Sequence, residues 1–220
     1  MLSPKKENYL KAIFKLSEMK TSSISTNAIA NHLDTSAASV SDMLKRLTEK
    51  ELISYEKYKG VRLTELGMKI ATSLIRRHRL WEVFMVQSLN FSWDEVHPIA
   101  EQLEHIKSEE LINRLDKFLG YPEFDPHGDP IPDRDGNLHY RNHQMTLAEL
   151  EEGLPAVIVG VREHSPSFLK YVEKLGLTLG KNIRIEEKFE YDGAVRLRVN
   201  ETNQQIVTNK VIQNLYISLA

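Results

Sequence analysis

The chain has 220 residues, of which 41% are hydrophobic, and it contains no cysteine. This length is enough to bury a core as one large domain or as two to three small ones. The absence of cysteine excludes disulfides, thiolate metal ligands and cysteine nucleophiles, and no apolar run approaches the roughly 18 residues that cross a bilayer, so we expect a cytoplasmic protein with no membrane partner.

The net charge of −2 hides an uneven distribution. Residues 1–80 contain 15 Lys and Arg against 8 Asp and Glu, a balance of +7, which leaves 14 against 23, or −9, for residues 81–220. A basic N-terminal third suits a DNA-binding module because it offsets phosphate charge, although a balance of +7 is modest by itself.

Three helices are expected in the first 50 residues. Apolar residues recur at helical spacing over residues 4–19 and 26–32, and Ser36 can cap a third helix that ends near Lys50. Two short helices joined by a tight turn are typical of a helix-turn-helix, although an ordinary helical hairpin has the same pattern. The basic turn within residues 52–63 predicts a two-stranded wing, which favours a winged helix.

The candidate DNA contacts lie on the third helix and at the tip of the wing. Small residues at the start of a recognition helix let its backbone approach the major groove, and polar or basic side chains then reach base edges or phosphates. The candidates are Ser36, Ala38, Ser39, Ser41, Asp42, Lys45, Arg46, Lys57 and Lys59.

Three further helices are expected over residues 64–85, 92–106 and 108–118, each preceded or opened by a Ser or Thr that can cap it. They carry more apolar and aromatic surface than a small helical domain needs, so we expect a homodimer formed through them. Trp81 and Trp93 are expected to be core or dimer anchors.

One face of the helix over residues 92–106 carries ligand-type side chains. From its first histidine, offsets of four, seven and eight residues fall at roughly 40°, −20° and 80° around a helix. His78 and Glu82 are likewise one turn apart on the preceding helix, and together these groups can hold one or two divalent cations, the alternative being a solvated polar stripe. The four residues on the shared face are His97, Glu101, Glu104 and His105.

The pattern changes after Gly120. Residues 121–146 hold four of the eight prolines and predict an ordered linker. Beyond it, a short helix is expected at residues 166–175. Strands are expected at 156–161, 182–189, 194–199 and 205–208. About five short strands in roughly 70 residues predict a small SH3-like barrel.

The expected fold class is therefore mainly α with small β. We expect a winged helix-turn-helix DNA-binding domain at residues 1–64, a helical metal-binding and dimerisation domain at 65–120, the proline-rich linker at 121–146 and an SH3-like domain at 147–220. The remaining histidines have no grouping of ligand type and are expected at the surface or in the linker. They are His32, His127, His139 and His143.

Five segments together resemble the diphtheria toxin repressor family of metal-dependent transcriptional regulators, in its long form with a C-terminal SH3-like domain. They are KENYLKAIFKL, KYKGVRLTELG, RRHRLWE, EVHPIAEQLEHI and PHGDPIP, and they extend over essentially the whole chain. The resemblance implies a primary metal site made by Asn8, Glu101, Glu104 and His105. It also implies an ancillary site made by His78, Glu82 and His97, with Glu163 or His164 of the SH3-like domain as a further contributor.

Three positions depart from the family pattern. Glu101 and Asn8 stand where iron-responsive members carry a cysteine and a methionine. Manganese regulators usually have an aspartate in place of Asn8 and a second carboxylate in place of Lys11. Carboxylate, amide and imidazole ligands without thiolate or thioether suit Mn²⁺ or Fe²⁺ better than Cu⁺ or structural zinc, and we expect Mn²⁺ to be favoured over Fe²⁺.

The expected function is a metal-activated repressor, not an enzyme. With Mn²⁺ or Fe²⁺ bound, a dimer would bind double-stranded operator DNA and control metal uptake genes. Two alternatives stay open: a winged-helix regulator with a non-metal effector, and a metal-dependent hydrolase, which would leave the winged helix unexplained.

Overall fold

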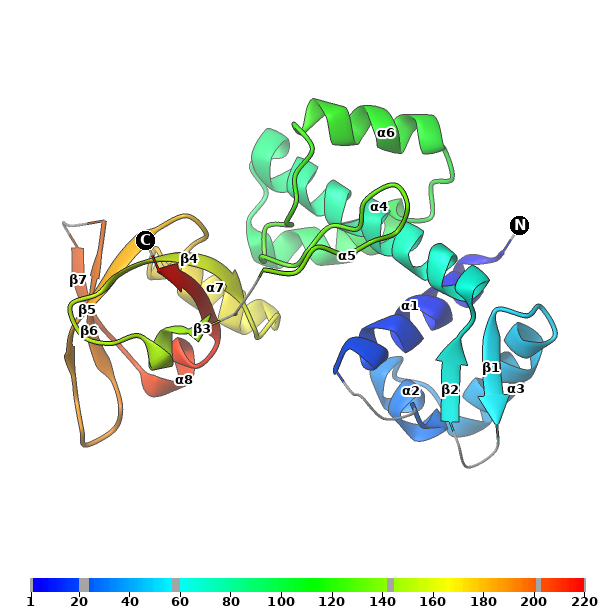
Figure 1. The fold of residues 1–220 in the computed structure, drawn as a ribbon, viewed down its shortest axis with the longest axis horizontal. Coiled ribbons are helices and arrows are strands. Elements are labelled where there is room, and N and C mark those ends of the chain that lie inside the picture. Colours follow the sequence, from blue (N-terminus) through cyan, green and yellow to red (C-terminus); the bar gives the residue numbers. More distant parts are fainter. Residues whose placement is uncertain (1, 20–23, 57–59, 142–144, 201–202, 220) are drawn as a thin grey trace.

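The computed structural model describes residues 2–219 apart from 20–23, 57–59, 142–144 and 201–202. The winged helix lies at one end of the molecule, the C-terminal sheet lies at the other, and a group of helices lies between them (Figure 1). No helix of the described residues is long and apolar enough to cross a bilayer. The expected fold class, mainly α with a small β domain at the C-terminal end, is confirmed.

The N-terminal end is a helix-turn-helix followed by the strand pair of the wing. Its core joins all three helices through fully buried side chains such as Leu10, Ile29 and Leu44. Ser36 caps the third helix, because its hydroxyl accepts the backbone N–H of Ser39 at 3.2 Å. The elements are α1 (Pro4–Met19), α2 (Thr26–His32), α3 (Ala37–Thr48), β1 (Ile53–Glu56) and β2 (Gly60–Leu63).

The helical part begins with a long helix that packs against both α1 and the helix that follows it. The three helices are α4 (Glu65–Leu89), α5 (Trp93–Leu103) and α6 (Glu109–Phe118). The prediction that the second helix continues to Ile106 is wrong, because Glu104 caps α5 and the chain then turns toward Ser108, which caps α6. His105 therefore lies in a turn and not on a continuous helical face.

The proline-rich segment after α6 forms a strap along α4. Arg76 donates to the carbonyl oxygen of Pro132 at 3.1 Å, and Arg79 pairs with Asp125 at 3.5 Å and Asp129 at 3.2 Å. Both arginines are buried on α4. The strap, defined as residues 119–141, is therefore held by cations of α4 as well as by its own prolines.

The described part of residues 145–219 forms a six-stranded antiparallel sheet in the order β3-β8-β4-β5-β6-β7. The sequence analysis did not predict β3, α8 or β8, because elements of two to five residues are too short for periodicity to identify. The elements are β3 (Met145–Thr146), β4 (Pro155–Val161), α7 (Pro166–Lys174), β5 (Asn182–Lys188), β6 (Val195–Val199), β7 (Asn203–Val207), α8 (Asn209–Ile212) and β8 (Leu215–Leu219), with a 3₁₀ turn at Leu147–Glu149.

The C-terminal domain is fixed to both the helical part and the strap. Trp93, the first residue of α5, belongs to the hydrophobic core of the C-terminal domain. The backbone N–H of Val161 donates to the carbonyl oxygen of His127 at 2.9 Å. Gly128 has φ +90°, and a Cβ there would lie 2.3 Å from the carbonyl oxygen of Val159. Only glycine allows this close approach between strap and strand β4.

Candidate metal centre

The Glu82 carboxylate lies at the centre of imidazoles from two helices. Glu82 Oε1 lies 2.9 Å from His78 Nε2 and 3.2 Å from His97 Nδ1, and the two nitrogens lie 3.0 Å apart. His78 and Glu82 stand one turn apart on α4, and His97 comes from α5. The structure thus brings together all three residues expected in the ancillary site.

A second group of donors includes the same carboxylate and comes from the strap. Ligand atoms of Glu82, Asp125 and His127 lie within 4.8 Å of one another. His127 Nδ1 lies 3.8 Å from Glu82 Oε2, and its Nε2 lies 3.2 Å from the carbonyl oxygen of Trp93. His127 lies in the expected linker, but the expectation that it has no ligand-type grouping is wrong, because the strap folds back over α4 and buries this ring beside Glu82 with 5% of its surface exposed.

The sequence analysis missed Asp125 and His127 as donors. The available signal was two ligand-type side chains two residues apart, next to prolines that restrict the backbone. That signal is weak in a segment whose position relative to α4 is unknown.

The pKa values of the buried groups in this cluster depend on burial and on the charges of their neighbours. Burial disfavours the charged forms, yet the Glu82 and Glu104 carboxylates raise the pKa of His78. Burial likewise opposes the negative charge of Glu82, but the imidazoles of His78 and His97 lower its pKa well below the usual value. Burial and neighbouring carboxylates raise the pKa of Asp125 to about 7. A divalent cation bound here would displace protons from these groups.

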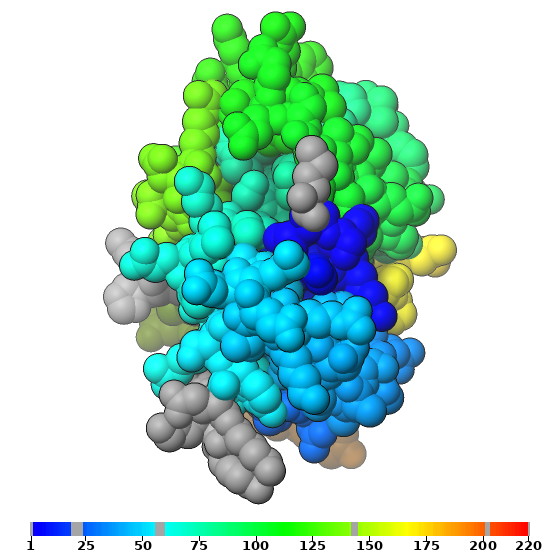
Figure 2. Space-filling view, turned by 90° about the vertical axis from the view of Figure 1, so that its right-hand side faces the viewer, coloured from blue at the N-terminus to red at the C-terminus, as the bar shows by residue number. Residues whose placement is uncertain are grey.

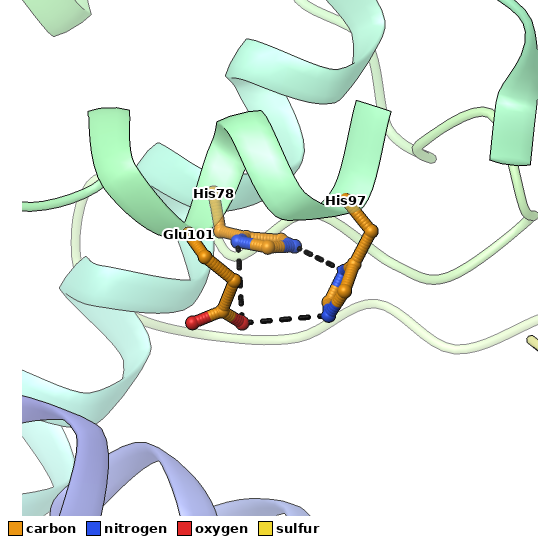
Figure 3. Close-up of side chains that lie close together, drawn as sticks. All are labelled: His78, His97 and Glu101. Atoms are coloured by element: carbon orange, nitrogen blue, oxygen red, sulfur yellow. Dashed lines mark hydrogen bonds and ion pairs between the residues drawn. The ribbon is translucent and has the colours of Figure 1, made fainter. Parts of the chain in front are cut away.

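Glu101 joins the imidazoles on the open side of the cluster (Figure 3). Its Oε1 lies 3.5 Å from His97 Nε2 and 4.0 Å from His78 Nδ1. His78 and His97 line a cavity of about 150 Å³ between α1, α4, α5, the strap and α7. The side chains of His97 and Glu101 are 50% and 35% exposed, whereas that of His78 is 5% exposed, so this group of donors extends from the surface to a buried imidazole.

Of the other residues of the expected primary site, Glu104 and His105 follow the end of α5, whereas Asn8 lies on α1 and lines a pocket with Leu33, Asp34 and Thr35. Glu104 Oε1 and Asn8 Oδ1 are buried and have no hydrogen-bond partner among the described residues. His105 Nε2 lies 3.9 Å from Glu104 Oε1. The residue of α1 that contacts His105 is Glu7, whose Oε2 lies 2.7 Å from His105 Nδ1. These contacts place Glu104 beside His105 and join both to α1.

Lys11 lies between these two regions. Its Nζ donates to Glu101 Oε1 at 2.7 Å and to Glu104 Oε2 at 2.5 Å, and it lies 3.2 Å from His78 Nδ1. His78 Nδ1 lies 2.6 Å from Glu104 Oε2, which orients the ring so that Nε2 faces Glu82. Although burial opposes it, the Lys11 charge lowers the pKa of Glu101.

Of the two candidates from the SH3-like domain, His164 lines the cavity. The centroid of its ring lies 5.4 Å from that of His127. Glu163 is engaged elsewhere, because it accepts a hydrogen bond at 2.6 Å from the hydroxyl of Ser165, the residue that caps α7.

The recognition helix α3 separates a buried apolar face from an exposed polar one. Ser41 is half-buried and donates to the carbonyl oxygen of Ala37 at 2.9 Å. Arg46 pairs with Asp42 at 2.8 Å, and both side chains are about 60% exposed. The predicted contacts Lys57 and Lys59 lie outside the described residues. The exposed candidates are Ser36, Ala38, Ser39, Asp42, Lys45 and Arg46.

Three family descriptions match the chain in order. Residues 1–61 match the N-terminal DNA binding domain of iron dependent repressors. Residues 64–133 match their metal binding and dimerisation domain, and residues 145–219 match the FeoA domain. The matched segments together extend over almost the whole chain.

Individual relatives agree with these matches. The iron-dependent repressor IdeR of Mycobacterium tuberculosis is 33% identical over 165 residues, which cover 70% of this chain and 69% of that one. The diphtheria toxin repressor of Corynebacterium jeikeium is 32% identical over 149 residues, covering 68% and 56% of the two chains. A solved manganese-dependent transcriptional repressor in complex with manganese superposes with a TM-score of 0.81 at 31% identity, covering 98% of this chain and 100% of that one. The chain therefore belongs to the iron-dependent repressor family of metal-dependent transcriptional regulators, as its resemblance to the diphtheria toxin repressors indicated.

Proposed function

We propose that this chain is a cytoplasmic, metal-activated repressor that binds operator DNA as a homodimer when Mn²⁺ is bound. Its targets would be metal uptake genes. The observation that carries this proposal is the cavity in which donors from α4, α5 and the strap converge beside the DNA-binding domain. The residues that would hold the ion are His78, Glu82, His97, Asp125 and His127.

The chemistry of the donors supports Mn²⁺, with Fe²⁺ as the second candidate. Imidazole and carboxylate ligands suit these ions, and the sequence offers no thiolate. A manganese-dependent repressor and iron-dependent repressors are both among the relatives. When bound, the ion supplies positive charge that draws the carboxylates and imidazoles of separate elements together.

We also propose a second set of ligands, formed by Asn8 of α1 together with Glu101, Glu104 and His105 at and just after the end of α5. Asn8 Oδ1 and Glu104 Oε1 support it, because both are buried without a partner among the described residues and a buried polar atom ordinarily has one. Since Asn8 belongs to α1, an ion held by this set would link the DNA-binding domain to the helical part. His164 is the candidate contributor from the C-terminal domain, whereas the Ser165 contact of Glu163 makes it the weaker one.

Metal binding would act on the arrangement of domains. The donors come from the helical part and from the strap, and the strap is hydrogen-bonded to β4. Bound metal stabilises whichever arrangement holds it more tightly, and only that difference in affinity shifts the population. The repressor would therefore bind DNA when the metal-bound arrangement sets the two recognition helices at the spacing of the major groove.

Homodimer formation is supported by exposed apolar residues of the helical part. Leu89 of α4 and Leu111 and Phe118 of α6 are 52%, 40% and 68% exposed. In a dimer, the two α3 helices would enter successive major grooves, about 34 Å or a multiple of it apart.

The test is a gel shift of the purified protein on DNA from its own promoter region. We expect a shift with Mn²⁺ or Fe²⁺ that a chelator reverses, and its loss in Glu104→Ala and His105→Ala dimers that remain folded. DNA binding that ignores both metal and chelator would favour a non-metal effector. Full metal response in both variants would remove the second ligand set from the proposal.

A further inference from the structure

Lys11 on α1 is almost fully withdrawn from water, with 4% of its surface exposed. Burial of an ammonium group is unfavourable unless opposite charges surround it. Figure 2 shows α1 between the rest of the winged helix and the helical part of the molecule. The carboxylates of Glu101 and Glu104 compensate the Lys11 charge, and both come from that helical part, 90 and 93 residues further along the chain.

These partners form the kind of shell that ordinarily surrounds a metal ion. Two carboxylates, Glu101 and Glu104, accept from Lys11 Nζ at 2.7 and 2.5 Å, and an imidazole nitrogen of His78 lies 3.2 Å away. Carboxylates and an imidazole are the ligands that Mn²⁺ and Fe²⁺ take. Here the cation at their centre is part of the chain.

A metal ion at the same point would meet two obstacles. The oxygen of Glu104 that faces this point is already engaged by both Lys11 and His78. An incoming divalent cation would also lie beside the ammonium charge in a buried setting, where like charges repel strongly. The remaining oxygen of Glu104, Oε1, lies 3.9 Å from His105 Nε2 and has no hydrogen-bond partner in the described part of the chain.

We propose that the Lys11 ammonium is a built-in cation that takes the place of a metal ion between Glu101, Glu104 and His78 and ties α1 to α5 without metal. It follows that ions bind on either side of Lys11, around Glu82 and around His105, but not at Lys11 itself. It also follows that the DNA-binding domain is already attached to α5 in the metal-free protein. The first consequence rests on the proposed function; the second does not.

The first experiment counts bound ions. Wild type, Lys11→Glu, Lys11→Gln and the control Lys5→Met are dialysed against Mn²⁺, and metal per subunit is measured by elemental analysis after folding has been checked by circular dichroism. Lys5 is an exposed lysine on the same helix. We expect one additional ion per subunit in Lys11→Glu, the same ion bound more weakly in Lys11→Gln, and the wild-type count in the control. A wild-type count in both Lys11 variants overturns the exclusion of metal at this point.

The second experiment follows amide hydrogen exchange in full-length protein kept metal-free with chelator. Lys11→Met keeps the apolar stem and removes the charge, so exchange over Pro4–Met19 should become about tenfold faster or more, since carboxylates buried around the ammonium lose their partner. Exchange in β5 and β6 should stay at the wild-type rate, as should α1 in Lys5→Met. Unchanged protection of α1 in Lys11→Met overturns the metal-free tie. If wild type binds no Mn²⁺, the proposed function fails, and this exchange measurement still tests Lys11.

Discussion

Replacing Glu82 by glutamine removes the charge on which the candidate metal centre depends while preserving the shape of the side chain. The Glu82 side chain is 3% exposed and lies within 3.2 Å of nitrogens of both His78 and His97. Breaking a buried ion pair costs about 3–5 kcal/mol. Because His78 can release its proton once the carboxylate is gone, we expect a loss near the lower end, about 3 kcal/mol, in the metal-free protein.

Glu82→Gln should also weaken the binding of Mn²⁺. Loss of a residue that merely orients a ligand weakens metal binding by about 10–100-fold, so loss of a charged ligand should reach at least about 100-fold. At a free Mn²⁺ concentration of about 100 times the wild-type Kd, metal stabilises wild type by about 2.7 kcal/mol. At the same concentration the variant would gain only about 0.4 kcal/mol.

Urea unfolding with Mn²⁺ and with chelator measures both quantities. The matched control is Glu110→Gln, which makes the same change in an exposed pair with Arg114, where both side chains are more than 70% exposed, and it should alter stability by less than about 0.5 kcal/mol. A metal-induced stabilisation of Glu82→Gln equal to that of wild type would refute the placement of the ion at Glu82.

Three further predictions concern the recognition helix, the contact of the strap with β4, and the turn that begins at Asp133 within the strap. Arg46→Ala should weaken operator binding and lower the salt slope by about 1 per subunit. Arg114→Ala, which removes a more exposed ion pair one turn apart on α6, should change neither quantity. The assay is a gel shift at several salt concentrations, and an unchanged slope in Arg46→Ala would count against a phosphate contact. Gly128→Ala should lower the free energy of unfolding by about 1–3 kcal/mol, because a Cβ there meets the Val159 carbonyl oxygen. It should also weaken Mn²⁺ binding measured by calorimetry. Wild-type stability and wild-type Mn²⁺ affinity in this variant would mean that the strap is not held at Gly128. Hydrogen bonds from the side chain and backbone of Asn137 lower the pKa of Asp133 to about 2, below its value in the unfolded chain. The ionised Asp133 should therefore stabilise the fold fully above about pH 4, and this stabilisation, which Asp133→Ala removes, should disappear as the pH falls toward 2. Urea unfolding of wild type and Asp133→Ala across this range tests it, and a difference in unfolding free energy that does not change with pH would contradict the linkage.

The helical and winged-helix elements could be predicted because their signals are local. Helix periodicity, capping by Ser36 and Thr64 and the apolar pattern of α3 all arise within a few residues. The end of α5 could not be predicted in the same way. Apolar spacing continued to Ile106, but the chain turns at Glu104 so that α6 can pack back on α4.

Part of the candidate site could be predicted from the sequence, because some of its contacts are local. His78 and Glu82 meet because they are one helical turn apart, which is a local fact. His97 could be grouped with them only by assuming that α5 lies beside α4. Asp125 and His127 reach Glu82 through a strap whose path depends on Arg76 and Arg79 of α4, and no short-range pattern encodes that path.

By itself, the sequence determined which donors this protein has: imidazole, carboxylate and amide groups without thiolate, on elements whose type can be derived from spacing. Only the tertiary structure decided which donors share a centre. It placed Lys11 between Glu101, Glu104 and His78 and buried His127 against Glu82. The physical reason is that ligand identity is a property of single residues, whereas the balance of buried charge depends on which side chains, far apart in the chain, are packed together away from water.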